Sequence, residues 1–261
     1  MKTDKLVAME KSGKILHEAL LLVVKSVKPG ISGLEINAIA ENYIINQNAK
    51  PSFKGYKGFP AGLCVSINNV VVHGIPSSYK LKNGDLVGLD LGVFYSKYHT
   101  DSAVSVIVTE SGCITAEELI KISNKSDFSD LNVKERLICV CYKSLYIGID
   151  QAKIGGKSGD IGESIQEYIE KYGFGVVREL VGHGVGEHIH EDPSIPNFGS
   201  KNTGSILKEH QTIAIEPMVT VGDWHVEVLK DNWGIATKDG TLSAHFEHTI
   251  YISDSGPIIL T

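Results

Sequence analysis

The chain has 261 residues, of which 42% are hydrophobic and 21% are charged. This composition is near the average for a globular protein and excludes a disordered chain, because so much apolar material must be buried. The net charge of −6 argues against direct binding of nucleic acid, which requires a basic face that neutralises phosphates.

The sequence carries no signal for a membrane or for secretion. The longest uninterrupted apolar stretch near the start is 19–24, far short of the about 20 residues that a membrane span needs. No apolar segment followed by a small-residue cleavage site opens the chain. The cysteines form no C-x-x-C pair, so we expect a cytoplasmic protein with free thiols at Cys64, Cys113, Cys139 and Cys141.

The first half predicts two helices followed by strands. Apolar side chains recur at three- and four-residue spacing over 6–27, and Pro29 ends this helix because proline cannot continue the hydrogen-bond ladder. Ser32 and Glu35 form a capping-box pattern, which predicts a second helix over about 34–47. Strand-like residues follow at 63–72.

Two long apolar runs, 85–95 and 98–109, then read as a hairpin. The stretch 110–130 is polar and turn-rich, and it is predicted to be a surface insertion or a connection between two halves. In the second half, helices are predicted over about 133–151 and from Ser158 to before Gly173. Strands are expected near 176–180, 211–219 and 246–253.

The second half repeats the order of the first. Residues 30–44 and 155–169 align at a constant offset of 125, which matches Glu35 with Asp160 and Tyr43 with Tyr168. Two amphipathic helices can be alike by chance, but each half also carries an acid embedded in an apolar strand. We therefore favour a duplication, with one domain over 1–261, pseudo-twofold halves of about 1–130 and 131–261, and a site on the axis.

Three acids lie inside or directly beside apolar strands, where acids are depleted. Asp90 lies within 86–94, Glu216 lies within 213–219, and Glu247 precedes the run that ends at Ile252. One buried carboxylate is most often a structural hydrogen-bonding group. Several of them, without matching buried lysines or arginines, favour a cation site.

The predicted hairpin would place two acids on its neighbouring strands close to each other. If Tyr95 and Ser96 form its tip, Asp90 lies directly opposite Asp101. Opposed like charges destabilise a strand pair, so this register predicts that the two acids share a cation.

Seven of the ten histidines follow residue 180, and they are densest in 181–193. This segment lacks the H-E-x-x-H pattern of helical zinc proteases. In a strand, His188 and His190 would share a face as a metal pair, although each alone is more simply a surface histidine. Glycines at 182, 184 and 186 allow ligands to approach His183 closely. One imidazole with several carboxylates suits Mn(II), Fe(II) or Co(II) better than a structural zinc.

Five motifs stand out along the chain: His183-Gly184-x-Gly186, His190-Glu191-x-Pro193, Ile215-Glu216-Pro217-Met218, Asn68-x-Val70-Val71-x-His73-Gly74-Ile75-Pro76 and Ser243-Ala244-x-Phe246-Glu247-His248-Thr249. In these motifs the sequence resembles the methionine aminopeptidases. The resemblance is collinear over about 5–261, and the short gap between His190 and Glu216 is similar to the bacterial type I form.

The resemblance implies a pita-bread α/β (α+β) fold, in which a curved, mainly antiparallel sheet carries helices on its outer face. It also implies removal of the initiator methionine from nascent chains by two divalent ions, Co, Mn or Fe(II), with Zn or Ni as further candidates. Asp101 and Glu247 would bridge the metals. The full set of implied metal ligands is Asp90, Asp101, His183, Glu216 and Glu247.

Other roles also follow from the resemblance. Glu216, His73 and His190 are the implied catalytic residues, and the two histidines would contact the substrate. A monovalent-cation site would fall at Asn68, Val70 and Ser243. The implied methionine pocket is Phe53, Tyr56, Phe59, Cys64, Ile189 and Trp233, although many relatives have cysteine in place of Phe53 and phenylalanine in place of Ile189.

The expected partners are the N-termini of nascent polypeptides at the ribosome, and the expected state is a monomer. Two alternatives within the same fold are a Xaa-Pro aminopeptidase or prolidase, and a binding protein without metal. The first usually carries an additional N-terminal domain, and the second typically loses ligands that are present here.

Overall fold

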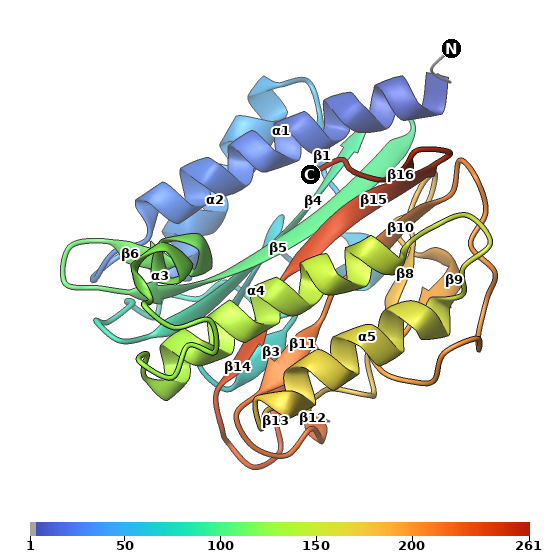
Figure 1. Cartoon of the computed structure of the whole chain (residues 1–261). Helices are drawn as coiled ribbons and strands as arrows, with labels where there is room; N and C mark the ends of the chain where they lie inside the picture. The colour runs from blue at the N-terminus through green and yellow to red at the C-terminus, as the bar shows by residue number, and fades with distance from the viewer. Residues whose placement is uncertain (1–3) are drawn as a thin grey trace.

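A computed structural model describes residues 4–261 as a strongly curved antiparallel sheet with helices packed along it (Figure 1). The helices are α1 (Asp4–Ser26), α2 (Gly33–Asn46), α3 (Ala116–Ile122), α4 (Val133–Gln151) and α5 (Ser158–Lys171), with a 3-10 turn at Tyr56–Gly58. The strands of the first half are β1 (Lys50–Pro51), β2 (Leu63–Ile67), β3 (Val70–Val72), β4 (Leu86–Tyr95), β5 (Tyr98–Val108) and β6 (Cys113–Thr115).

The second half supplies shorter strands. They are β7 (Gly175–Val176), β8 (Gly182–Gly184), β9 (Glu191–Ile195), β10 (Thr212–Ile215), β11 (Met218–Thr220), β12 (Val226–Val228), β13 (Ile235–Thr237), β14 (Ser243–His245), β15 (Glu247–Ser253) and β16 (Gly256–Ile259). Seven strands of the ten-stranded sheet follow the order β1-β4-β5-β15-β10-β8-β9, and the other three pair beside them: β2 with β4, β6 with β5 and β16 with β15. The β5–β15 pair joins the two halves. Two three-stranded sheets, β14-β11-β7 and β12-β13-β3, complete the structure.

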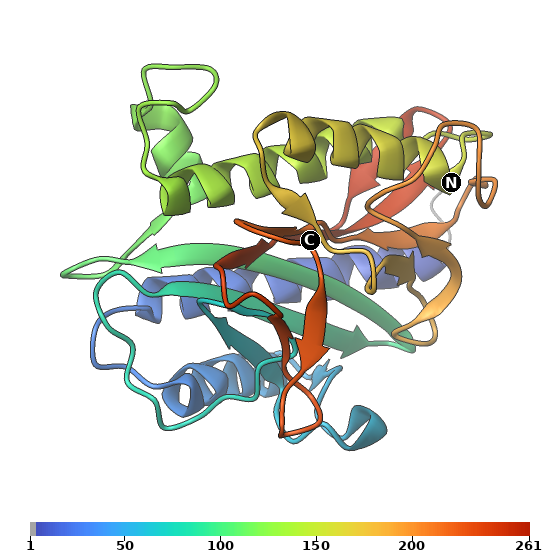
Figure 2. The ribbon, with the colours of Figure 1, turned by 90° about the horizontal axis from the view of Figure 1, so that it is seen from below.

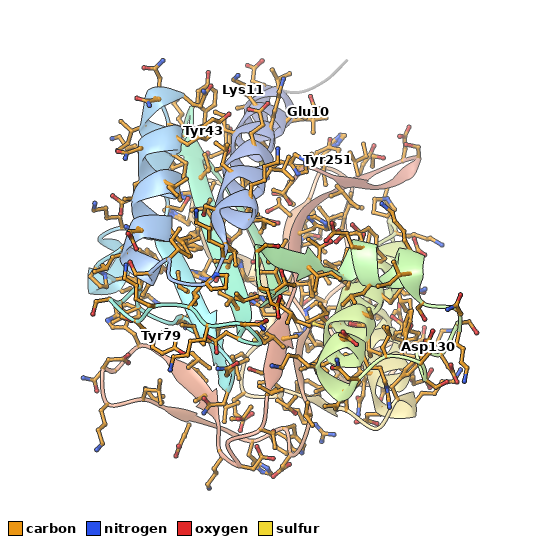
Figure 3. All side chains as sticks on the ribbon, turned by 90° about the vertical axis from the view of Figure 1, so that its left-hand side faces the viewer. Glu10, Lys11, Tyr43, Tyr79, Asp130 and Tyr251 are labelled. Atoms are coloured by element: carbon orange, nitrogen blue, oxygen red, sulfur yellow. The ribbon has the colours of Figure 1, made fainter. Side chains whose placement is uncertain are left out.

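Four of the helices form two pairs, α1 with α2 and α4 with α5, and each pair covers the strands of one half (Figures 1 and 2). In the first pair, α1 and α2 pack together, and the Tyr43 hydroxyl on α2 donates to the Glu18 carboxylate on α1 at 2.6 Å (Figure 3). The predicted capping box is confirmed, since Ser32 and Glu35 satisfy each other's backbone N–H groups at the start of α2.

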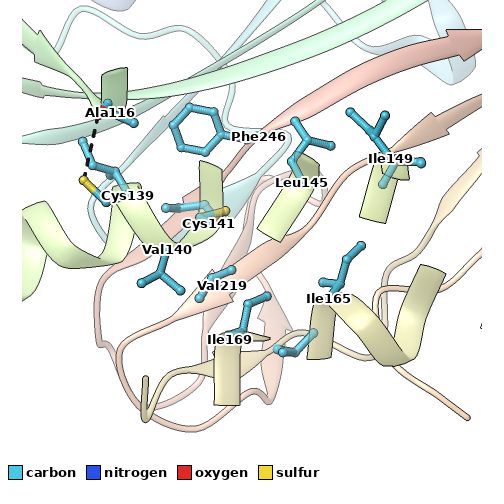
Figure 4. Close-up of a cluster of buried hydrophobic side chains, with 14 of the residues drawn as sticks. Ala116, Cys139, Val140, Cys141, Leu145, Ile149, Ile165, Ile169, Val219 and Phe246 are labelled. Atoms are coloured by element: carbon cyan, nitrogen blue, oxygen red, sulfur yellow. Dashed lines mark hydrogen bonds between the residues drawn. The ribbon is translucent and has the colours of Figure 1, made fainter. Parts of the chain in front are cut away.

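The second pair packs more closely. A Cβ atom on Gly148 of α4 would lie 2.6 Å from Cδ1 of Ile165 on α5, so this crossing requires glycine. Figure 4 shows side chains of both helices, among them Cys141 and Ile169, meeting Val219 and Phe246 of the second half. α2 (33–46) and α5 (158–171) begin and end at the offset of 125 residues that the sequence alignment predicts.

The register predicted for the hairpin is wrong by two residues. Ser96 and Lys97, both with positive φ angles (48° and 78°), form the tip. Asp90 therefore pairs with Ala103, and Asp101 pairs with Gly92. A shift of two residues keeps both acids on the same face, as diagonal neighbours rather than direct partners.

The stretch 110–130 is more ordered than a plain surface insertion. β6 pairs with β5, and α3 begins at a capping box formed by Thr115 and Glu118. Ala116 and Leu119 are buried in the same core as α4, whereas Asp130 lies on an exposed loop at the periphery (Figure 3). Both elements are too short to give a periodic sequence pattern. Within residues 4–261, no helix has the length and apolar character needed to cross a membrane.

Candidate metal centre

Five side chains from separate elements converge on one cavity of about 360 Å³. Each half of the chain contributes to it, and the cavity lies where the strands of the two halves meet. The residues are Asp90 on β4, Asp101 on β5, His183 on β8, Glu216 between β10 and β11, and Glu247 at the start of β15.

The ligand atoms of Asp101, His183 and Glu247 all lie within 4.8 Å of one another. Nε2 of His183 also lies 3.5 Å from Oε1 of Glu216. Nδ1 of His183 lies 2.9 Å from the carbonyl oxygen of Gly184, which can only accept a hydrogen bond. Nδ1 therefore carries the proton, and the lone pair of Nε2 faces the acids, as a metal ligand requires.

The acids are held in an environment that opposes their negative charge. Burial raises the pKa of Asp90 to about 7 and that of Glu216 to about 7. Burial, together with the charges of the neighbouring carboxylates, raises the pKa of Asp101 and Glu247 well above the ordinary range. A bound cation would offset both effects by pairing with the carboxylates, and so would lower these pKa values.

Three buried oxygens of these acids have no hydrogen-bond partner among the described residues. They are Oδ1 of Asp90, Oδ1 of Asp101 and Oε1 of Glu247. Buried polar atoms are normally paired, and several unpaired oxygens aimed at one point are typical of a cation site. The donor set of four carboxylates and one imidazole thus fits divalent cations that prefer oxygen ligands.

Two further histidines line the cavity, and both are held neutral. Burial lowers the pKa of His73 to about 4, and burial followed by the neighbouring His183 lowers that of His190 to about 3. Nδ1 of His190 lies 2.9 Å from the hydroxyl of Tyr56. His73 has a positive φ of 58° and precedes Gly74, where a Cβ atom would lie 2.3 Å from the carbonyl oxygen of Val65.

The less favoured interpretation of His188 and His190 as a pair of metal ligands is not supported by the structure. Residues 186–190 form bends rather than a strand, so the alternation that would align the two side chains is absent. His188 is exposed, and its backbone N–H donates to Glu191 at 2.7 Å. The surface interpretation of His188 therefore applies.

An apolar slot adjoins the acids. Phe59 and Trp233 meet edge to face with ring centroids 5.1 Å apart, and Cys64 lies in the same cluster. Five of the six residues proposed for the methionine pocket line the cavity: Phe53, Tyr56, Phe59, Cys64 and Trp233. Ile189 is buried at 2% exposure and does not line it.

The residues proposed for a monovalent cation lie together near the start of β3 and β14. The backbone N–H of Ser243 donates to the carbonyl oxygen of Asn68 at 2.9 Å, and the Ser243 hydroxyl lies 3.4 Å from the same oxygen. Val70 begins β3 and pairs with Ala236.

The sequence interpretation missed several residues of the site. Lys57, Val72, Glu179, Leu180, Val181 and Met218 also line the cavity. His245 was missed as well, although its buried Nε2 lies 3.6 Å from Oε2 of Glu216. The only signal for His245 was its place inside the motif 243–249, two residues before Glu247.

Comparison with known proteins agrees with this geometry. A model of metallopeptidase family M24 matches residues 7–254. The chain is 45% identical over 253 residues to the methionine aminopeptidase of Clostridium perfringens, covering 97% of this chain and 94% of that protein. It is 44% identical over 256 residues to methionine aminopeptidase 1 of Bacillus subtilis, with the same coverage of 97% and 94%.

A solved structure agrees in fold. The crystal structure of methionine aminopeptidase from Rickettsia prowazekii superposes with a TM-score of 0.89 at 37% identity, covering 100% of this chain and 98% of that one. The pita-bread fold predicted from the resemblance is thereby confirmed.

Proposed function

The chain belongs to metallopeptidase family M24 and to its bacterial type I methionine aminopeptidases, and we propose that it removes the initiator methionine from nascent proteins whose second residue is small and uncharged. One observation carries the proposal. Four buried carboxylates and a histidine with a free Nε2 converge in one cavity beside an aromatic slot. The slot supplies selectivity, and the acids supply a place for the catalytic cations.

Two divalent cations are proposed, with Asp101 and Glu247 between them. His183 and Glu216 would complete the shell of one cation, and Asp90 would hold the other. Divalent cations at such a site polarise a carbonyl group and lower the pKa of water. Co, Mn and Fe(II) are the preferred candidates, because the donor set is rich in oxygen. The additional monovalent cation at Asn68, Val70 and Ser243 rests on the resemblance.

The chain's own residues would carry the proton transfers. Glu216 accepts a proton from the attacking water and passes it to the leaving amine, which is general acid–base catalysis by one carboxylate. Without a cation, burial raises the pKa of Glu216 to about 7. A bound cation would lower this pKa again, which would leave the carboxylate ionised and able to accept the proton of the water. Neutral His73 and His190 each have a ring N–H to offer to the substrate carbonyl.

The apolar slot would select methionine. An unbranched, polarizable thioether fills an irregular apolar space well, and sulfur contacts aromatic rings favourably. Phe59 and Trp233 present such rings. The resemblance to the family implies that the second residue of the substrate, which would lie beside His73 and the acids, must be small, so we propose that alanine, glycine or serine is preferred over lysine, arginine or leucine.

We further propose that the partners are nascent chains at the ribosome, and that the protein acts as a cytoplasmic monomer. Sedimentation with isolated ribosomes that carry a stalled nascent chain would test the first part. Sedimentation of the protein alone would test the second.

The decisive experiment measures methionine release by metal-free protein supplied with each divalent cation in turn. Met-Ala-Ser should be cleaved, and Met-Lys-Ser and Leu-Ala-Ser should not. Formyl-Met-Ala-Ser should resist, because formylation converts the α-amine into an amide, whose nitrogen lone pair is delocalised into the carbonyl group and cannot bind a cation. Ala-Pro-Ser separates the Xaa-Pro alternative, and its preferential cleavage would contradict the proposal, as would absence of any cleavage with every cation.

A further inference from the structure

His245 is a buried histidine next to the metal centre that none of the roles above uses. It lies on β14 with 3% of its surface exposed. Its Nε2 is buried and has no hydrogen-bond partner among the described residues. The other unpaired buried oxygens of the site belong to Asp90, Asp101 and Glu247, so this nitrogen belongs to the same unsatisfied cluster.

The Glu216 carboxylate lies between two imidazoles. Its Oε1 faces Nε2 of His183 at 3.5 Å, and its Oε2 faces Nε2 of His245 at 3.6 Å. His183 and Glu216 both line the cavity, whereas His245 is not among the described residues that do. Oε1 is therefore the oxygen next to the cavity's imidazole ligand, and His245 approaches Glu216 from behind the cavity wall.

The fold fixes His245 against Glu216 through both neighbouring strands. On one side, His245 is the register partner of Met218, two residues after Glu216. On the other side, its backbone N–H donates to the Ser105 hydroxyl at 3.0 Å, and that hydroxyl lies 2.9 Å from its carbonyl oxygen. The main chain of His245 is thus tied on both sides, and the imidazole stays within reach of Glu216.

Cys141 of α4 ties the two strands together. Its thiol lies 3.3 Å from the carbonyl oxygen of Pro217 and 3.5 Å from that of Ala244. These carbonyls belong to the residues that directly follow Glu216 and precede His245. Movement of either residue away from the other is therefore restrained.

We propose that His245 is a positioning residue whose Nε2–H donates to Oε2 of Glu216 and so holds Oε1 toward His183. This inference rests on the proposed function, since it assigns a role in orienting Glu216. The two atoms face each other just beyond hydrogen-bond length, and a shift of a few tenths of an ångström closes the bond. Outer hydrogen bonds of this kind orient metal ligands and maintain their affinity.

A role for His245 as a sixth metal ligand fits less well. The described side chains whose ligand atoms lie within 4.8 Å of one another are Asp101, His183 and Glu247, without His245. A ligand would need its Nε2 lone pair to point into the cavity, but His245 is not among the described residues that line the cavity.

The test compares His245→Gln, which keeps an N–H donor, with His245→Leu, which removes it at similar volume. Binding of Mn(II) to metal-free protein is measured by calorimetry, and kcat and KM are measured on Met-Ala-Ser. His245→Leu should lower Mn(II) affinity by about 10- to 100-fold, the usual effect of losing such a partner. It should also lower kcat with little change in KM, and His245→Gln should restore most of both.

One control and one alternative variant accompany these measurements. His225→Leu removes an exposed histidine that pairs with Asp223, and it should match the wild type in every measurement. If His245→Leu does not fold, as judged by circular dichroism, Ser105→Ala tests the same contact. It loosens the main chain of His245 while keeping the imidazole, so Mn(II) affinity should fall in the same direction.

Each outcome bears on one proposal. Wild-type Mn(II) affinity and kcat in His245→Leu would overturn the positioning role, and so would equal damage in His245→Gln. Loss of one bound Mn(II) equivalent in His245→Leu would make His245 a ligand instead. If the wild type releases no methionine but His245→Leu still weakens Mn(II) binding, the proposed function fails and the positioning role stands.

Discussion

The two halves of the molecule position their metal ligands by different means. In the first half, Asp90 and Asp101 lie on β4 and β5, which pair continuously from Leu86↔Ile107 to Tyr95↔Tyr98. In the second half, Glu216 lies in a break between two strands of four and three residues. His183 lies on a three-residue strand joined to β10 through the single pair Ile213↔Gly184.

Where the strands of the second half are interrupted, hydrogen bonds from side chains take the place of the backbone hydrogen bonds between strands. The Asn197 amide donates to the carbonyl oxygen of Glu216 at 3.0 Å. Hydroxyl groups join the halves across β5 and β15: that of Ser102 donates to the Glu247 carbonyl at 2.7 Å, and that of Thr249 donates to the Asp101 carbonyl at 2.9 Å. A regular ladder thus places the acids of the first half, and single hydrogen bonds from distant residues place the ligands of the second.

We expect the largest effect from the loss of one metal ligand, tested with one variant in each half. Asp101→Ala and Glu247→Ala should each abolish methionine release and bound metal, because each leaves unpaired acids facing one another without a bridge. Metal content would be measured by mass spectrometry after gel filtration. Asp254→Asn, an exposed acid just beyond the same strand as Glu247, is the control and should keep both properties. Full activity of the wild type after exhaustive chelation would contradict the two-metal proposal.

The second largest effect is expected from Glu216, the proposed ligand between β10 and β11 that would transfer the proton. Glu216→Gln keeps the shape of the side chain but cannot exchange a proton. We expect kcat on Met-Ala-Ser to fall by about 10²–10⁴ or more, the usual contribution of a general acid–base group, with an added loss from the weakened ligand. Saturating Mn(II) in the assay separates the two causes. A kcat near that of the wild type at saturating metal would show that another group moves the proton.

The slot draws one aromatic wall from each half, Phe59 from the first and Trp233 from the second. Trp233→Ala should weaken the binding of methionine by roughly 1–3 kcal/mol, the scale of losing most of one buried apolar contact. Inhibition by free methionine and kcat/KM on Met-Ala-Ser would measure it. Trp224→Ala, which removes the other tryptophan of the chain, is the matched control. Unchanged inhibition by free methionine together with an unchanged kcat/KM in Trp233→Ala would argue against a methionine slot.

Removing the metal should make stability depend on pH in a defined direction. In the metal-free protein, burial raises the pKa of Asp90 and of Glu216 to about 7, from ordinary values of 3.8 and 4.5. The folded state then binds more protons than the unfolded state between those values. The stability that these groups contribute is complete below about pH 4 and is lost as the pH rises toward 7.

Bound cations should reverse this loss, since they bind the ionised acids. At a free cation concentration about 100 times its dissociation constant, binding should raise the free energy of unfolding by about 2.7 kcal/mol. The difference in Tm between loaded and chelated protein should therefore widen from pH 5 to pH 7.5 in calorimetry. A difference that narrows over this range would mean that the acids are not the cation's ligands.

The difference between long regular elements and short interrupted strands also explains which features could be predicted from the sequence. The long helices and the hairpin were predicted because each has many residues at a regular period, and the acids stand out against apolar neighbours. The register slipped by two because Ser96 and Lys97 are not a typical turn pair. The predicted strand 211–219 is broken at Glu216 because Pro217 has no N–H to donate.

Contacts that depend on distant residues left no local pattern. The hydrogen bond between Asn197 and Glu216 joins residues 19 positions apart, and the one between Tyr56 and His190 joins residues 134 positions apart. His245 was visible only as an unspecified position inside the motif that ends at Thr249. Periodicity indicates which face is buried, but it does not indicate which distant side chain completes a ligand's hydrogen bonds.

The smallest expected effect tests one hydroxyl at the junction of the halves. Ser102→Ala removes the bond to the carbonyl oxygen of Glu247. The free energy of unfolding should fall by about 0.5–1.5 kcal/mol, the usual net contribution of one hydrogen bond. Because Glu247 is a proposed bridging ligand, Mn(II) affinity should fall as well. Ser253→Ala is matched to it, since it removes a hydroxyl bond at 2.6 Å to Gly256 at the other end of β15. Urea unfolding should show similar losses for both variants, and only Ser102→Ala should weaken Mn(II) binding in calorimetry. Equal Mn(II) affinities in the two variants would mean that the ladder between β5 and β15, and not the hydroxyl, places Glu247.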